Sequence, residues 1–108
     1  MTLHARDHFP IPEDTARVAR QVYPKGDNVW MTARDHLGFW YRDSDYADLF
    51  VANQGRAAES PARLNMILIV QFAEGLTDRQ VAEAVRSRID LKYLLGLRLT
   101  DQGFDPSI

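Results

Sequence analysis

The sequence predicts an all-α domain, a small bundle of five or six helices in which the last three form a helix-turn-helix-like unit. Its 108 residues suffice for about one domain, and 45% apolar with 26% charged residues is ordinary for a globular chain. Apolar side chains recur at helical spacing, and the six glycines are isolated, mostly at predicted helix ends. We treat residues 1–108 as one domain, with an aromatic-rich helical lead-in over 1–59 and the three-helix unit over 60–99.

Composition excludes several classes of protein. The longest apolar run, Met66 to Val70, is far shorter than the ~20 residues of a membrane helix, and no apolar segment follows the N-terminus as in a secretory signal. The absence of cysteine excludes disulfides and thiolate zinc sites and suits a reducing compartment. A net charge of −2 excludes binding of nucleic acid through overall charge, so such binding must use a local patch. We therefore expect a cytoplasmic protein with no membrane partner.

The first helix is predicted to begin near Pro12. A proline suits the first turn, and the two acidic residues that follow it favour the positive end of the helix dipole. Val18, Ala19 and Val22 supply an apolar stripe, and the helix ends in the turn-forming sequence 23–26.

The second helix is predicted over residues 29–37, with Gly38 as the residue that ends it. Residues 39–41 follow as a brief extended segment. A short helix capped at position 43 or 44 comes next, and residues 52–59 are predicted to form a loop.

The second half of the chain opens with Ser60 and Pro61, a typical pair of cap and first-turn residues. From Arg63 to Glu74 the sequence is apolar almost all round, which is typical of a helix buried at the centre of its domain. Gly75 ends this helix.

A capping box over residues 77–80 begins the next helix, because the Thr77 hydroxyl and the Gln80 side chain can satisfy each other's backbone donors. Its predicted buried positions are Val81, Ala82, Val85 and Ile89.

The last helix is predicted to be capped by Asp90 and stopped by Gly96. We expect its three leucines to face the core, and Lys92 and Tyr93 to face outward.

Two short helices joined by a tight connection and preceded by a buried helix match the outline of a helix-turn-helix unit. In that geometry the helix at 77–86 crosses the phosphate backbone, and the helix at 90–95 offers its outward residues to a groove of double-stranded DNA. Arg and Lys can pair with phosphates or guanine edges, and Tyr can bond a phosphate or stack on a base. An ordinary solvated surface is the alternative reading of the same residues. The predicted DNA-contact residues are Arg79, Arg86, Ser87, Arg88, Lys92 and Tyr93, with Arg98 at the margin of the set.

The densest aromatic cluster lies in the lead-in and has two interpretations. It can close a small core against residues 61–75, or it can form an exposed surface for protein contacts, where aromatic residues are enriched. The second interpretation makes the domain a helical protein–protein interaction module, serving self-association or regulation. Exposure of these rings in one patch would favour the module, whereas convergence of Arg86, Arg88 and Lys92 would favour DNA binding. The cluster comprises Trp30, Phe39, Trp40, Tyr41, Tyr46 and Phe50.

No catalytic or metal site is predicted. His4 and His8 have the i, i+4 spacing of metal ligands, with Asp7 and His36 as candidate additions, but Pro10 disfavours a helix there. Each serine that could act as a nucleophile has an explanation as a helix cap or turn residue, and neither a nucleophile elbow nor a glycine-rich phosphate loop occurs. We expect no metal, no cofactor and no small-molecule substrate.

A series of specific stretches extends over nearly the whole chain. It includes Ser-Pro-Ala-Arg-Leu at 60–64, Gln-Phe-Ala-Glu-Gly-Leu-Thr-Asp-Arg-Gln at 71–80 and Arg-Ser-Arg-Ile-Asp-Leu-Lys-Tyr at 86–93. Gly-Leu at 96–97, the loop at 100–107 and the opening stretches 10–13 and 23–26 continue it. Together these stretches resemble the N-terminal domain of bacterial insertion-sequence transposases of the InsH-like group.

The resemblance implies a DNA-recognition region that engages the terminal inverted repeats of a mobile element. The expected partners are double-stranded DNA and a second copy of the chain, because dimerisation would raise the affinity, and the expected location is the nucleoid. In this family a catalytic domain of RNase H-like fold follows and holds metal ions with an Asp-Asp-Glu triad. The sequence reaches only Ile108, and neither Asp101 nor Asp105 fills that triad. We therefore expect a non-catalytic chain, either a gene remnant or a fragment of a longer transposase.

Overall fold

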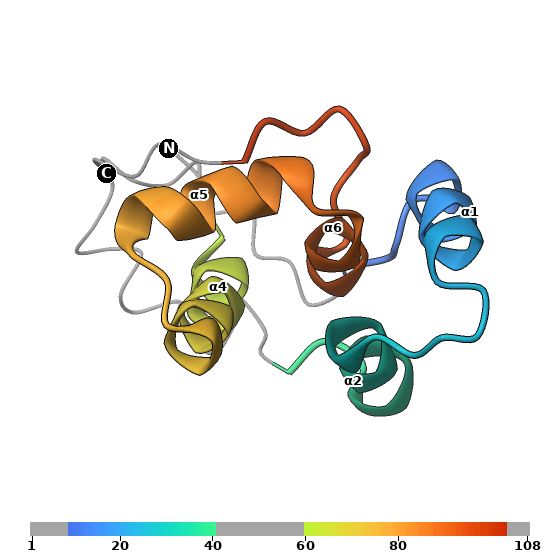
Figure 1. Ribbon diagram of the computed structural model, residues 1–108, viewed down its shortest axis with the longest axis horizontal. Coiled ribbons are helices and arrows are strands. Elements are labelled where there is room, and N and C mark those ends of the chain that lie inside the picture. The colour runs from blue at the N-terminus through green and yellow to red at the C-terminus, as the bar shows by residue number, and fades with distance from the viewer. Residues whose placement is uncertain (1–8, 41–59, 104–108) are drawn as a thin grey trace, which may run out of the picture.

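A computed structural model describes residues 9–40 and 60–103, and every regular element in these two ranges is a helix (Figure 1). The prediction of an all-α domain is confirmed. The predicted short helix after position 43 or 44 and the loop 52–59 lie outside the described residues, as does Tyr41. None of the described helices is long and apolar enough to cross a membrane. The helices are α1 (Glu13–Val22), α2 (Val29–Leu37), α4 (Pro61–Glu74), α5 (Asp78–Ser87) and α6 (Ile89–Leu95).

The shortest helix, α6, lies at the centre of the fold. It packs against α1, α2 and α5, and Figure 1 shows it between α5 and α2 with α1 to one side. Its leucines are completely buried, as predicted, but Lys92 and Tyr93 are also only 3% and 1% exposed. The prediction that these two residues face outward is therefore wrong. A seven-residue helix that neighbours cover on three sides has no outward face to offer.

Helix α6 is too short to be stable alone, so tertiary packing must hold it. Its last carbonyl groups would be left without intrahelical donors, and two arginines from other helices supply them. Arg34 of α2 donates to Leu94 O at 2.8 Å and also bonds Phe9 O. Arg63 of α4 donates to Leu95 O at 3.1 Å. Burial lowers the pKa of the Arg34 guanidinium, whose positive charge also suits the negative end of the helix dipole.

The core consists of two hydrophobic clusters that share α6. The larger joins α4, α5 and α6 with Trp30 of α2, and the smaller joins Ala19, Met31 and Tyr93. Complete burial of one leucine side chain contributes roughly 1.5–3 kcal/mol. Because α6 supplies three of them, it contributes more to the core per residue than its length suggests. The larger cluster comprises Trp30, Met66, Ile67, Val70, Val81, Ala84, Val85, Leu91, Leu94, Leu95 and Leu97.

The helix boundaries predicted at Gly38, Ser60 and Thr77 are confirmed. Helix α2 has the predicted limits, and Gly38 follows it with φ 67°. The Ser60 hydroxyl accepts from the Arg63 amide at 3.1 Å. The capping box is complete: the Gln80 amide donates to the Thr77 hydroxyl at 3.1 Å, and the Thr77 amide donates to Gln80 Oε1 at 2.9 Å.

The corner between α5 and α6 differs from the prediction. A single extended residue, Arg88, separates the two helices, so Ile89 begins α6 instead of extending α5, and it is half-buried. Asp90 does not cap α6; it lies inside the first turn, 3% exposed. Its carboxylate accepts from the side chains of Arg88 and Asn28 and from the Leu91 amide.

Two predicted burial patterns are also corrected. Helix α1 buries Ala19 of the predicted stripe, together with Thr15, but Val18 is only half-buried and Val22 is 54% exposed. The reason is that α1 packs mainly against α6 and the segment after it, where the Thr15 hydroxyl donates to Leu97 O at 2.7 Å. Helix α4 is not buried all round, because its side away from α5 and α6 has no neighbouring helix in the described part of the chain. Phe72 on that helix is 89% exposed.

Candidate nucleic-acid interface

The six side chains predicted to contact DNA divide into two groups. Lys92 and Tyr93 lie inside the molecule, whereas the others lie on α5 or directly after it. The structure therefore does not bring all six together on one face. Those on or after α5 are Arg79, Arg86, Ser87 and Arg88.

Tyr93 links three helices. Its hydroxyl accepts a hydrogen bond from Arg20 of α1 at 2.8 Å and donates one to Asp35 of α2 at 2.5 Å. The Arg20 guanidinium also lies over the Tyr93 ring, 5.6 Å from its centroid. Burial and the hydrogen bond to Asp35 raise the pKa of the Tyr93 hydroxyl. With its ring in the core, Tyr93 cannot stack on a base in this conformation.

Lys92 holds down the segment that follows α6. Its ammonium donates to Asp101 O at 2.6 Å, and the Asp101 carboxylate accepts from the Gly103 amide at 2.8 Å. Burial lowers the pKa of the Lys92 amine. This lysine therefore fixes the path of residues 97–103 and is not presented to a phosphate.

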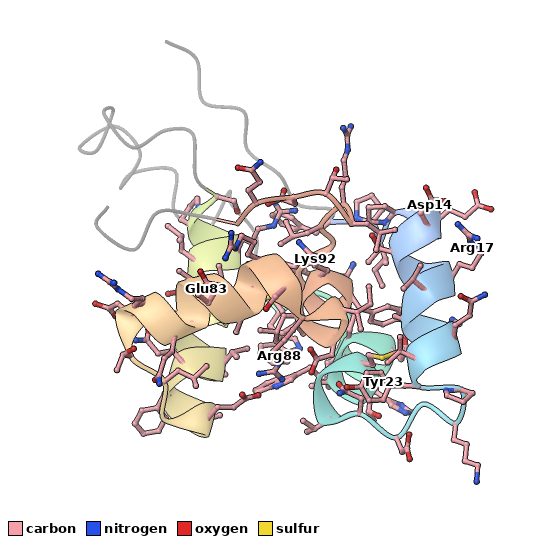
Figure 2. The ribbon with its side chains drawn as sticks, turned by 45° about the horizontal axis from the view of Figure 1, so that its top comes forward. Asp14, Arg17, Tyr23, Glu83, Arg88 and Lys92 are labelled. Carbon is pink, nitrogen blue, oxygen red and sulfur yellow. The ribbon has the colours of Figure 1, made fainter. Side chains whose placement is uncertain are left out.

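Arg88 is half-buried between two carboxylates. Its guanidinium donates to Glu74 at 2.6 and 3.1 Å and to Asp90 at 2.7 and 3.1 Å, so it is bidentate on both sides. These bonds raise the pKa of Arg88 and lower the pKa of Glu74. Figure 2 shows Arg88 beneath the α5–α6 corner, directed toward the middle of the molecule. The positive charge of Arg88 is therefore neutralised by these two carboxylates within the fold.

The two carboxylates extend this arrangement into α2. Glu74 accepts from the Trp30 indole N–H at 2.7 Å, and Asp90 accepts from the Asn28 side-chain amide at 3.1 Å. Asn28 is also the cap of α2, accepting from the Trp30 and Met31 amides. One polar junction thus connects α2, the end of α4 and the α5–α6 corner. Sequence reasoning missed it because Glu74 and Asn28 are remote from Arg88 in sequence, and only the nearby Asp90 could have signalled it.

The outer face of α5 holds the remaining predicted contact residues. Arg79 and Arg86 are both exposed and seven residues apart, which places them on one face of the helix, about 10 Å apart along its axis. Glu83 lies between them and bonds Arg86 through both carboxylate oxygens at 2.6 Å. Hydrogen bonding within this pair lowers the pKa of Glu83 and raises that of Arg86. The Ser87 hydroxyl donates to Glu83 O at 2.7 Å, within the helix itself.

The members of the aromatic cluster that the structure describes support the core interpretation. Trp30 is 7% exposed and belongs to the larger core cluster, and Phe39 and Trp40 are half-buried against it. Phe39 also stacks on Phe9, with ring centroids 4.0 Å apart. Tyr46 and Phe50 lie outside the described residues. An exposed patch centred on the tryptophans is therefore not present.

The histidines and the aspartate weighed as candidate metal ligands can be followed only in part. Within residues 9–40 and 60–103, no group of three or more His, Cys, Asp or Glu side chains is arranged to hold a metal ion. His36 of α2 is exposed, and His4, Asp7 and His8 lie outside the described ranges.

Comparison with known proteins adds a family assignment to this geometry. No curated protein and no solved structure matches the chain. A family model described as "Transposase domain (DUF772)" matches residues 6–108, which include every described helix and both faces of α5. The resemblance to the N-terminal region of insertion-sequence transposases is thereby confirmed, and the chain belongs to the DUF772 transposase-domain family.

Proposed function

We propose that this domain binds double-stranded DNA at the ends of a mobile element, through the outer face of α5. The observation that carries the proposal is the pair of exposed arginines, Arg79 and Arg86, on one face of an exposed helix in a transposase-family domain. The proposal assigns no bond-breaking step to these 108 residues.

The electrostatics of α5 support this use. Arg79 forms no ion pair with any other described residue, so its guanidinium is available to a phosphate. Arg86 is paired with Glu83, but the two side chains are 55% and 60% exposed. An exposed pair of this kind contributes only about 0.2–1 kcal/mol, so a phosphate can replace the carboxylate at small cost.

The buried position of α6 changes which helix approaches DNA. Since α6 has no exposed face, it cannot enter a groove in this conformation. Helix α5 retains the role predicted for the first helix of the unit, lying against the phosphate backbone. Contacts to phosphates position a protein on DNA without reading sequence, so selection of the element ends would require contacts beyond these two arginines.

Affinity from two phosphate contacts is modest and strongly dependent on salt. Two neutralised phosphates predict a slope of about −2 for log K against log salt concentration. We therefore expect weak binding by one copy at physiological salt and measurable binding at ~50 mM salt.

A fluorescence-anisotropy titration tests the proposal. The probes are a duplex carrying the element's terminal inverted repeat and a random duplex of equal length. Arg79→Ala/Arg86→Ala should weaken binding about 10-fold at low salt. The matched control, Arg17→Ala/Lys25→Ala, removes the same charge from exposed positions on and after α1 and should weaken it less than about 2-fold. Equal losses in the two double variants, or no binding by the wild type, would contradict the proposal.

A further inference from the structure

The segment that follows α6 forms a turn with an exposed tip. Arg98, Leu99 and Thr100 are all exposed, between the buried Leu97 and the half-buried Asp101. The Asp101 amide donates to Arg98 O at 3.1 Å, which closes the turn. We name residues 98–101 the post-α6 turn.

Both ends of the post-α6 turn are fixed to the body of the domain. Before it, Leu97 O accepts from the Thr15 hydroxyl at 2.7 Å, and the Leu97 amide donates to Lys92 O at 2.9 Å. After it, Asp101 O accepts from the buried Lys92 ammonium at 2.6 Å, and the Asp101 carboxylate accepts from the Gly103 amide at 2.8 Å. The tip is therefore preordered, which lowers the entropy lost when it binds a partner.

The end of this segment lies beside the row of α5 that carries Arg79 and Arg86. A Cβ atom built on Gly103 would lie 3.6 Å from Ala82 O and 3.6 Å from the Arg86 amide nitrogen. Ala82 is three residues after Arg79 and four before Arg86, so it belongs to the same row of the helix. Figure 1 shows the segment leaving α6 and returning over α5.

This packing limits how far Arg98 can be from α5. The ends of a four-residue turn are less than about 7 Å apart, and the two further residues to Gly103 add at most about 7 Å. Because Gly103 touches Arg86, the Cα atoms of Arg98 and Arg86 lie within about 20 Å of each other, less than the ~34 Å of one turn of duplex DNA. The post-α6 turn and α5 can therefore contact the same turn of one duplex.

Arg98 shares a second property with Arg79. Among the arginines in residues 9–40 and 60–103, these two alone form no hydrogen bond, ion pair or ring contact. The others bond carboxylates, backbone carbonyl groups or the Tyr93 hydroxyl. Both unpaired guanidinium groups thus belong to segments that pack against each other.

The tip of the turn has the chemistry of a base-reading element. It combines the Arg98 guanidinium, the apolar side chain of Leu99, which is 37% exposed, and the Thr100 hydroxyl. A guanidinium pairs with two acceptors of guanine, a hydroxyl bonds base edges, and an apolar group contacts the thymine methyl. These partners lie together in the major groove, which is wide enough for an α-helix and so for a single turn.

We propose that the post-α6 turn enters the major groove of double-stranded DNA and that Arg98 contacts a base edge there. The inference rests on the proposed contact between α5 and the phosphate backbone, which would place the turn at the groove. Phosphate contacts position a protein and base contacts specify the sequence. Helix α5 then supplies affinity for any duplex, and the turn supplies the preference for one sequence that the buried α6 cannot supply.

The preference between two duplexes tests this inference. Anisotropy titrations at ~50 mM salt compare the terminal-repeat duplex with a random duplex of equal length. Arg98→Ala should lower the ratio of the two affinities at least about 5-fold and change the affinity for the random duplex less than about 2-fold. Lys25→Ala, which removes an exposed and unpaired charge from the turn after α1, is the matched control and should leave the ratio unchanged.

The outcomes separate this inference from the proposed function. Equal weakening on both duplexes by Arg98→Ala, an unchanged ratio, or a wild type that binds both duplexes equally would overturn the inference. The α5 contact would still stand if Arg79→Ala/Arg86→Ala weakens binding. A wild type that binds neither duplex would overturn both.

The support of the turn provides a second test, in which Lys92 is a positioning residue. Lys92→Met keeps the apolar stem of the buried side chain and removes the ammonium that bonds Asp101 O. The looser turn should lower the affinity ratio at least ~3-fold, with affinity for the random duplex unchanged. Far-UV circular dichroism verifies that the helices are retained. An unchanged ratio in the folded variant would overturn the fixed presentation of Arg98.

Discussion

Arg88 and Glu74 form a bidentate ion pair, with the two guanidinium nitrogens 2.6 and 3.1 Å from the two carboxylate oxygens. The pair joins the corner between α5 and α6 to the last residue of α4. Because Asp90 occupies the other side of the same guanidinium, Arg88 is a structural residue. The position of this basic residue in the turn between two helices is thus accounted for by the fold.

Loss of Arg88 should destabilise the fold more than loss of a surface arginine. Arg88→Ala leaves the buried Asp90 carboxylate, whose side chain is 4% exposed, without its cationic partner. We expect the free energy of unfolding to fall by about 2–4 kcal/mol. Arg86→Ala, which breaks an exposed pair on α5, should cost less than about 1 kcal/mol. Urea unfolding at pH 7 measures both, and similar losses would show that the Arg88 junction is unimportant.

Two glycines that end helices offer a matched comparison. Gly75 and Gly96 have nearly the same backbone conformation, φ 66° and 67°. A methyl group added at Gly75 meets nothing within 4 Å, whereas at Gly96 it would lie 2.7 Å from Phe9 O. Both alanine variants carry the left-handed cost of about 1 kcal/mol. Gly96→Ala should lose about 1–3 kcal/mol more in thermal or urea unfolding, and equal losses would contradict the close approach of residue 9 to α6.

Stability should decline in acid through Glu74. Its pKa is lowered from the ordinary value of 4.5, first by the hydrogen bond from Arg88. A carboxyl group with a lowered folded-state pKa contributes stability that is complete above its unfolded pKa and is lost as pH falls through the folded value. Glu74→Gln should therefore be less stable than the wild type at pH 7, with the difference shrinking below about pH 4.5. Urea unfolding from pH 7 to pH 3 measures this, and a constant difference would contradict it.

Neutralising Glu83 should strengthen DNA binding. Glu83→Gln releases Arg86 from its ion pair and removes a negative charge from the outer face of α5. We expect affinity at ~50 mM salt to rise about 2- to 5-fold. The α1 pair between Asp14 and Arg17 has the same i, i+3 spacing and lies on the opposite side of the molecule from Glu83 (Figure 2). Asp14→Asn should leave the affinity unchanged in the same anisotropy assay, and an equal rise would indicate a general charge effect.

The features that the sequence predicts best are those with short-range causes. The cap residues Ser60 and Thr77 and the terminal glycines 38, 75 and 96 act on their own backbone, so their helix boundaries follow from sequence alone. The burial of Lys92 and Tyr93 has long-range causes. The Tyr93 hydroxyl donates to the Asp35 carboxylate, and the Lys92 ammonium donates to the backbone carbonyl of Asp101. Neither partner can be identified from the periodicity of the sequence.

The candidate site shows the same division. Arg79 and Arg86 are predicted to be outward by helical spacing within one helix, and they are exposed. The bonds that hold Arg88 in place depend on how α4 and α2 pack against the α5–α6 corner. A local sequence pattern does not predict this packing. The exposure of Phe72 is equally a property of the assembled bundle. An apolar stretch such as α4 predicts burial, but it does not say which side the neighbouring helices cover.

The salt dependence of DNA binding tests the central claim most directly. Binding by the wild type and by Arg79→Ala/Arg86→Ala would be measured on the terminal-repeat duplex from ~50 to ~200 mM salt. If α5 contacts two phosphates, the wild-type slope should be steeper by about 2, since each lost contact removes close to one unit. Parallel slopes with equal affinities would show that the outer face of α5 does not bind DNA.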